Sequence, residues 1–462
     1  MNHAAGRTPS FALVVLATCM AFVVGQLDVT IVNVALPAMA RSLDADVAQL
    51  QWVVDAYAVA FAAFMLSAGA LGDRFGARHA FQWGMAIFGL ASIGCALAGD
   101  AGTLDAARAV QGLGAAVMLP NSLALLNHAL AHDARARARG IGYWTAAGSV
   151  SIALGPVLGG LLVSGSGWPA IFWVNVPLCA LGLWLVRRLD ETPTGRDRPP
   201  LDVAGQLLAT LLLALLIATL IESRARGAGD PRVWGGAVAT LALGAALALV
   251  ERRAAAPVIA TDLFALRDFR HAVFFGAVVN GTYYGAIFVI ALFLQTVRHY
   301  TPLQAGLAFL PLTAGFFLSN VLSGRVVTRL GTRKPMIVGA LVDLAGFGVL
   351  AWASTTDGVA LMLLGFLLIP TGMGLAVPAM TTTVLSAVDK SRSALAAAIL
   401  NTARQAAGAI GVAVFGALAS GGPQHIAPGL RITCMVAMVA LALAALAAMR
   451  LRGVPPTGGA SH

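Results

Sequence analysis

The chain alternates long apolar stretches with short polar connections. A helix needs about 20 apolar residues to cross the hydrocarbon core of a bilayer, within a range of about 17 to 25. By this criterion the sequence predicts fourteen transmembrane helices and an all-α membrane protein. The predicted spans are 11–36, 50–71, 80–98, 103–126, 139–163, 168–186, 203–221, 233–250, 272–296, 303–324, 335–353, 358–382, 395–419 and 430–449.

The composition supports this class. Apolar residues make up 59% of the chain and charged residues 11%, which excludes an ordinary water-soluble domain. A net charge of +10 could indicate nucleic-acid binding, which needs basic residues gathered on a soluble surface. Here they fall in short groups between apolar runs, so they predict membrane topology and no nucleic-acid partner. The four cysteines lie inside apolar runs without metal-ligand spacing, which predicts packing roles and no metal site.

Basic residues also predict the orientation, because cytoplasmic loops near helix ends are rich in Lys and Arg. With the N-terminus inside, the inner connections hold Arg74, Arg78, Arg135, Arg137, Arg139, Arg187, Arg188, Arg196, Arg198, Arg252, Arg253, Arg267, Arg270, Arg325, Arg329, Arg333, Lys334, Lys390 and Arg392. The outer connections hold only Arg41, Arg224, Arg226, Arg232, Arg298 and Arg431. Both termini are therefore expected in the cytoplasm, with the chain in the inner membrane. The first run resembles a signal peptide, but its length and Asp28 argue against cleavage.

Two internal echoes predict a repeat. "GALGDRFGARH" (69–79) resembles "GRVVTRLGTRK" (324–334), and "QGLGAAVMLP" (111–120) resembles "PTGMGLAVP" (370–378). Transporters built from repeats place the substrate at the repeat interface near the membrane midplane. The predicted units are an N-terminal six-helix bundle (1–190), a linker with two added spans (191–255) and a C-terminal six-helix bundle (256–462).

Six motifs in order resemble the major facilitator superfamily, and specifically its fourteen-span drug/proton antiporters. They are "LDVTIVNVALP" (27–37), "GALGDRFGAR" (69–78), "RAVQGLGAA" (108–116), "GPVLGG" (155–160), "ERRAAAPVI" with a following "LF" (251–264) and "NTARQAAGAIGVAV" (401–414). The resemblance implies two pseudo-symmetric six-helix bundles plus two central helices. It also implies transport by alternating access, driven by a proton gradient without a cofactor. Spans ten and thirteen hold no acid, which argues against strong selection of dications.

Two of these motifs are candidates for conformational roles. The resemblance implies a cytoplasmic latch that steadies the outward-open state, formed by Gly69, Asp73, Arg74, Gly76 and Arg78. The alternative is a solvated turn that only sets topology. In the fifth span, proline removes a helix hydrogen bond and glycines allow close packing. The resemblance makes this segment an antiporter hinge of Gly155, Pro156, Gly159 and Gly160, whereas packing alone is the alternative.

Asp28 interrupts the first span, where a carboxylate is costly unless it is held or used. Arg108 lies at a similar depth in the fourth span, so the two are expected to pair, and Asp55 is expected in the same outer layer. An adjacent guanidinium favours the charged carboxylate, whereas loss of water favours the neutral acid. Movement of either would make Asp28 a proton carrier. The alternative is a static pair that holds helices together.

Other polar residues within spans are candidates for the substrate cavity. They are Gln26, Thr30, Asn33, Asn280, Tyr283, Tyr284, Asp343, Asn401, Arg404 and Gln405. On a helical wheel, Gln26, Thr30 and Asn33 lie nearly opposite Asp28, and the wheel leaves open which face lines the cavity. Interhelical hydrogen bonding and aromatic packing are the alternatives for the others. For Asp343, attraction of a cation, a second proton site and pairing with a polar neighbour all stay open.

The predicted function is proton-coupled export of amphipathic organic compounds such as drugs, antibiotics and toxic cations. The alternative is a dedicated exporter of one metabolite or antibiotic that uses the same mechanism. An enzyme is disfavoured because the eight histidines scatter over ends and loops, and no Ser/His/Asp or His/Glu constellation appears. No nucleotide-binding loop is present, which argues against ATP as the energy source. The expected partners are a small-molecule substrate, protons and the lipid bilayer, with no obligate protein partner.

Overall fold

The computed structural model describes residues 10–192, 203–227, 229–251, 261–356, 358–389 and 392–454. Within these ranges the chain is helical and contains no strand. Parts of the predicted middle unit (191–255) and of the motif at 251–264 lie outside the described residues, as do Arg196, Arg198, Arg252, Arg253 and Lys390.

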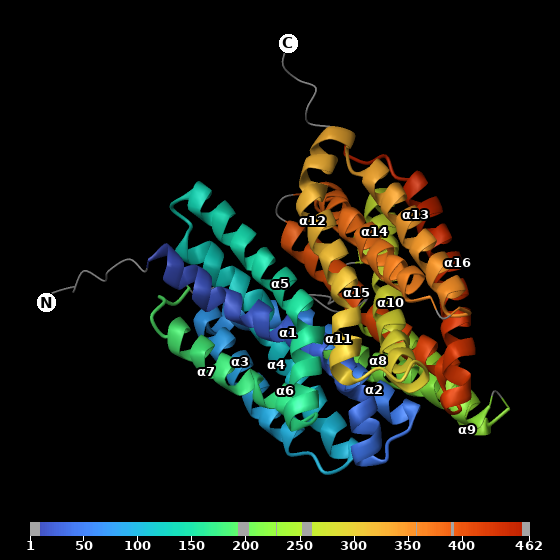
Figure 1. Cartoon of the computed structure of the whole chain (residues 1–462). Coiled ribbons are helices and arrows are strands. Elements are labelled where there is room, and N and C mark those ends of the chain that lie inside the picture. The colour runs from blue at the N-terminus through green and yellow to red at the C-terminus, as the bar shows by residue number, and fades with distance from the viewer. Residues whose placement is uncertain are drawn as a thin grey trace, which may run out of the picture.

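Helices occupy most of the described chain (Figure 1). The N-terminal half comprises α1 (Phe11–Leu43), α2 (Val47–Phe75), α3 (Ala77–Ala96), α4 (Ala101–Ala129), α5 (Ala134–Ser166), α6 (Ala170–Trp173) and α7 (Asn175–Val186). Two further helices follow, α8 (Val203–Arg226) and α9 (Pro231–Glu251). The C-terminal half comprises η1 (Thr261–Ala265), α10 (Arg267–Leu292), the π-helix η2 (Phe293–Val297), α11 (Pro302–Ala308), α12 (Leu310–Leu330), α13 (Arg333–Ala353), α14 (Val359–Ser386), α15 (Ser393–Ala419) and α16 (Pro423–Met449).

Twelve helices of the described chain are long and apolar enough to cross a membrane. The expected number of fourteen is therefore not supported by length and composition. The predicted spans 80–98 and 168–186 account for the difference. The first corresponds to α3, whose first two turns carry the polar residues Arg78, His79 and Gln82. The second corresponds to the short apolar stretch Ala170–Val186. Several helices are longer than their predicted spans because polar residues cap them beyond the apolar run. Asp46 and Gln49, for example, form a capping box at the start of α2.

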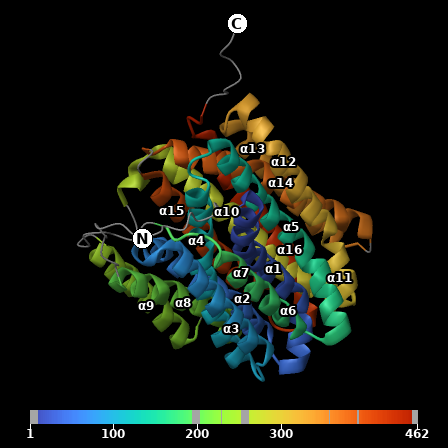
Figure 2. The ribbon, with the colours of Figure 1, turned by 90° about the vertical axis from the view of Figure 1, so that its left-hand side faces the viewer.

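The two halves form two bundles that lie side by side (Figure 1). Within the N-terminal half, α1 packs along α5, and α4 packs between α2 and α3. The C-terminal half shows a corresponding arrangement, in which α10 packs along α15, and α14 packs between α12 and α13. On one flank, α8 packs against both α2 and α15, while α9 packs against α8 (Figure 2).

The bundle has one end rich in basic residues. We call the end that holds Arg78, Arg135, Arg187 and Arg333 the basic end, and the end that holds the α1–α2 turn the opposite end. The halves meet toward the opposite end, through α2 with α15 and through α5 with α11. In Figure 1 the start of α5 and the end of α12, both at the basic end, lie apart.

Candidate functional site

Asp28 and Arg108 form a buried ion pair between α1 and α4. Arg108 Nη1 lies 2.5 Å from Asp28 Oδ2, and both side chains are almost completely excluded from solvent. Arg108 also donates through Nε to the carbonyl of Val53 at 2.9 Å. Its guanidinium lies over the ring of Tyr57, 4.5 Å from the centroid, in a cation–π contact. The pairing expected from depth is therefore present, whereas its role in proton coupling stays a prediction.

The other carboxylate oxygen of Asp28 accepts two further hydrogen bonds. Gln111 Nε2 donates to Oδ1 at 2.9 Å, and Asn175 Nδ2 donates to it at 3.0 Å. Gln111 also accepts from Arg108 at 2.6 Å and donates to Ser92 at 2.9 Å. The network therefore joins α1, α3, α4 and α7.

Three members of this network were not predicted from the sequence: Gln111 and Asn175, which bind Asp28, and Ser92, which binds Gln111. Gln111 follows Arg108 by three residues, which places both on one face of α4, so the spacing could have identified it. Asn175 and Ser92 lie on other helices, and only the packing of these helices brings them to Asp28.

Arg108 also reaches the boundary between the halves. It lines a small cavity with Tyr57 of the N-terminal half and with Tyr284 and Gln405 of the C-terminal half. The volume of about 30 Å³ suffices for one or two water molecules. A second, smaller cavity is lined by Thr30, Asn33, Pro156 and Tyr283, among others. Thr30 and Asn33 thus face the C-terminal half, whereas Asp28 faces the interior of its own bundle.

Asp55 is completely buried on α2, and neither carboxylate oxygen has a hydrogen-bond partner among the described residues. Gln51 and Val59 lie one turn before and after it on the same helix face, and both contact α15. Asp55 therefore lies toward the junction of the halves and not in the hydrogen-bond network of Asp28. Its part in proton coupling stays a prediction.

Several candidates in the C-terminal half also contact one another. Arg404 Nε donates to Asn280 Oδ1 at 3.0 Å, and Asn280 Nδ2 donates to the carbonyl of Arg404 at 3.2 Å, which joins α15 to α10. Tyr283 and Tyr284 are in edge contact, with ring centroids 5.3 Å apart. Asn401 and Gln26 are half-buried and line neither cavity.

Asp343 is buried on α13 and lines neither cavity. It packs against Gly372 of α14, where an added Cβ would lie 2.9 Å from Asp343 Cβ. Its Oδ1 has no hydrogen-bond partner among the described residues. In this arrangement Asp343 therefore has no direct contact with either cavity.

The latch residues lie at the basic end within the N-terminal half. Gly76 joins α2 to α3 with φ +92°, a backbone conformation that favours glycine. Glu191 accepts from the backbone N–H groups of Arg78 and His79 at 2.8 and 3.2 Å, and Arg78 Nη1 donates to the carbonyl of Leu189 at 2.9 Å. Glu191, which sequence analysis did not single out, therefore caps α3. Arg74 is exposed, and the side-chain surroundings of Gly69 and Asp73 lie outside the description.

The glycines of the hinge motif lie on two faces of α5. Gly155 and Gly159 pack against Thr30 and Ile31 of α1, in the same half. Gly160 packs across the interface, where an added Cβ would lie 2.7 Å from the carbonyl oxygen of Pro302 in the C-terminal half. The absence of a side chain therefore lets the halves touch backbone to backbone at this point.

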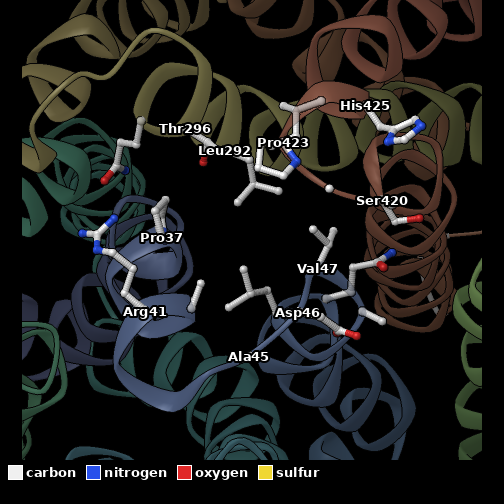
Figure 3. A pocket seen from close by; sticks show the side chains of 18 of the residues that line it. Pro37, Arg41, Ala45, Asp46, Val47, Leu292, Thr296, Ser420, Pro423 and His425 are labelled. Atoms are coloured by element: carbon white, nitrogen blue, oxygen red, sulfur yellow. The ribbon is translucent and has the colours of Figure 1, made fainter.

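A larger pocket of about 960 Å³ opens at the opposite end. Its walls come from both halves and from α8, and the side chains of Arg41, Asp46, Thr296 and His425 surround it (Figure 3). The hydropathy pattern gave no indication of this pocket, because its lining residues come from four separate segments of the chain, within 37–51, at 221, within 292–299 and within 420–426.

Comparison with known proteins identifies the family. The model of the Major Facilitator Superfamily matches residues 18–412. The chain belongs to this superfamily. Its members are transporters and not enzymes, in agreement with the multi-pass helical bundle.

Named relatives cover most of the chain. A methylenomycin A resistance protein of Streptomyces coelicolor is 38% identical over 405 residues, which covers 87% of this chain and 84% of that protein. The drug efflux pump JefA of Mycobacterium tuberculosis is 36% identical over 417 residues, which covers 89% and 81%. A tetracenomycin C resistance and export protein of Streptomyces glaucescens is 32% identical over 405 residues, which covers 87% and 75%.

Solved structures share the fold at low sequence identity. A D-xylose–proton symporter superposes with a TM-score of 0.70 at 15% identity, covering 98% of this chain and 100% of that one. A POT family transporter in complex with a thioalcohol-conjugated peptide gives a TM-score of 0.71 at 12% identity, covering 94% of each chain. These likenesses establish the fold alone.

Proposed function

We propose that this protein is a proton-coupled antiporter that exports amphipathic organic compounds across the cytoplasmic membrane by alternating access. The observation that carries the proposal is the Asp28–Arg108 pair, in which Asp28 is buried inside one bundle while Arg108 lines a cavity between the two halves. A substrate that enters between the halves at this point, once they move apart, would contact Arg108 and act through it on the charge state of Asp28. The resistance and efflux relatives support a drug as the substrate.

In this mechanism, the state of the pair changes with the conformation of the halves. While Asp28 is charged it holds Arg108 inside the N-terminal bundle, and a proton on Asp28 frees the guanidinium to move toward the cavity. A cationic substrate near Arg108 favours the charged form of Asp28, so binding of the substrate releases the proton from Asp28. Binding of substrate and binding of a proton then exclude each other, which is the requirement for antiport.

The proposal includes fourteen spans, with α3 and the α6–α7 segment as the remaining two. The 20 residues of α3 measure about 30 Å at 1.5 Å per residue, which matches the hydrocarbon thickness. It packs along α4, and α7 packs against α1 and α3, as transmembrane members of the bundle would. The 17 residues of Ala170–Val186 are at the lower limit for a span.

We further propose that the basic end is cytoplasmic and that both termini lie there. The structure is then closed toward the outside, because the halves meet at the opposite end, and it corresponds to an inward-facing state. In this state Arg78 binds Leu189 and Glu191 of its own half, which is consistent with a latch that engages the C-terminal half only in the outward-open state.

The substrate range is either broad or limited to one compound. JefA is described as a drug efflux pump, and another relative of Mycobacterium tuberculosis as a multidrug resistance protein, which favours a broad range. Relatives named for methylenomycin A, tetracenomycin C and puromycin favour a dedicated exporter. Efflux and susceptibility assays over a chemically varied panel separate the two, because a dedicated exporter changes the accumulation of one compound only.

The test of proton coupling is transport in proteoliposomes with an imposed pH gradient. We expect Asp28→Asn to abolish gradient-driven transport while leaving the protein folded. The matched control is Asp190→Asn, which neutralises an exposed acid just beyond α7 and should retain full transport. Full gradient-driven transport by Asp28→Asn would contradict the carrier role.

A further inference from the structure

Two buried glutamines link the halves in a reciprocal manner near the opposite end. Gln51 of α2 donates through Nε2 to the carbonyls of Val412 and Ala413 in α15, at 3.1 and 2.7 Å. Gln295 of η2 donates through Nε2 to the carbonyl of Val34 in α1, at 2.8 Å. Each half thus contributes one amide that binds the backbone of the other half.

The hydrogen bond from Gln51 to Val412 joins a residue of the large pocket to a residue of the interface cavity. Gln51 and Gln295 both line the pocket at the opposite end (Figure 3 shows this pocket). Val412, which accepts from Gln51, lines the cavity next to Arg108. The Gln51–Val412 hydrogen bond therefore stands where the two spaces approach each other.

The local structure is adapted to both amides. Gly416 leaves room for Gln51, since an added Cβ there would lie 2.5 Å from Gln51 Nε2 and 2.6 Å from its Cδ. Gln295 lies in a π-helical turn that follows α10, and such turns are rare and concentrate at functional sites. The carbonyls that accept these bonds belong to helices, so they keep their intrahelical partners if the amides leave.

We propose that the large pocket is the exit vestibule and that Gln51 and Gln295 are its gate. In the present state the three hydrogen bonds keep the vestibule closed from the interface cavity. When the halves separate at the opposite end, the bonds exchange with water, and the substrate passes from the Arg108 cavity into the vestibule. This inference rests on the alternating-access transport proposed above, but it does not depend on proton coupling.

The experiment measures access from the outside to a cysteine beyond the gate. Ala409 is buried and lines the interface cavity, so Ala409→Cys reports the passage of a charged, membrane-impermeant maleimide applied to intact cells. Ala45→Cys, in the vestibule wall, reports whether the reagent reaches the outer pocket at all. The parent chain measures the background from its four buried cysteines.

We expect Gln51→Leu and Gln295→Leu each to raise the labelling rate of Ala409→Cys. A net hydrogen bond shifts a two-state equilibrium by about fivefold, so Gln51→Leu, which removes two bonds, should exceed Gln295→Leu, which removes one. Gly416→Ala should also raise the rate, because the added methyl displaces the flexible Gln51 amide without removing it.

The matched control is Gln424→Leu, an exposed glutamine that bonds within its own segment and should leave the rate unchanged. Labelling of Ala45→Cys should be equal in every variant, which confirms folding and orientation. Equal rates at Ala409→Cys in the parent, Gln51→Leu and Gln295→Leu backgrounds would overturn the gate. Loss of proton coupling in the transport assay, with the labelling differences intact, would overturn the antiport proposal alone.

Discussion

The strongest test of the buried pair is a double-mutant cycle on Asp28 and Arg108. In Asp28→Asn, the side chain keeps its shape but offers one acceptor oxygen to three donors, from Arg108, Gln111 and Asn175. At least one donor then faces the new amide nitrogen, and the buried guanidinium loses its counter-charge. Breaking a buried ion pair in this way costs about 3–5 kcal/mol.

The remaining contacts of Arg108 offset only part of this cost. The Val53 carbonyl, the Gln111 amide oxygen and the Tyr57 ring stay in place, but none of them carries a negative charge. For a unit of the size of the N-terminal half, about 3–5 kcal/mol corresponds to a fall in melting temperature of roughly 6–20 °C. Arg108→Gln should cause a similar fall, because it leaves the carboxylate buried without its cation.

The double variant Asp28→Asn/Arg108→Gln should recover most of that stability, because no unpaired charge remains. We expect a coupling energy of about 2 kcal/mol or more, measured by thermal unfolding of the purified proteins in detergent. Additive losses in the double variant would refute the argument from charge pairing. The double variant also separates the two interpretations of the pair, since a static pair predicts retained gradient-driven transport and a proton carrier predicts none.

Three further predictions concern single positions. Gly160→Val should hinder closure at the opposite end, because its side chain meets the Pro302 backbone, and cysteine labelling from outside should rise while transport falls. Gly76→Ala should cost about 1–3 kcal/mol, measured by thermal unfolding, since φ +92° is unfavourable for alanine; an unchanged melting temperature would contradict this strain. Asp343→Asn should preserve efflux of neutral compounds, because Asp343 lines neither interface cavity, and loss of that efflux would assign it a direct role.

The sequence predicts the helices and the Asp28–Arg108 pair for definite physical reasons. Apolar runs must be helical in a bilayer, and two opposite charges at equal depth have few alternatives to pairing. The predicted count of fourteen spans exceeds the twelve helices that are long and apolar enough to cross a membrane. Helix α3 includes the polar residues Arg78, His79 and Gln82, which lower its hydropathy, and it ends at Ala96, before the end of the predicted span.

The remaining contacts could not be read from the sequence because they depend on packing between distant segments. Gln51 and Gln295 stand in apolar runs like ordinary packing residues, and their partners are backbone carbonyls, which carry no sequence signal. Glu191 lies in a connector with several other charges, so nothing distinguishes it before the fold brings it to α3. The packing of Asp343 against Gly372 likewise depends on how α13 meets α14.

The placement of α8 makes the two flanks of the transporter unequal. Because α8 packs against both α2 and α15, a compound dissolved in the membrane would meet α8 before it reached the seam between them. On the other flank, α5 meets α11 and α12 directly, without a covering helix among the described residues. A lateral entrance for an apolar substrate that partitions into the leaflet should therefore open between α5 and α12.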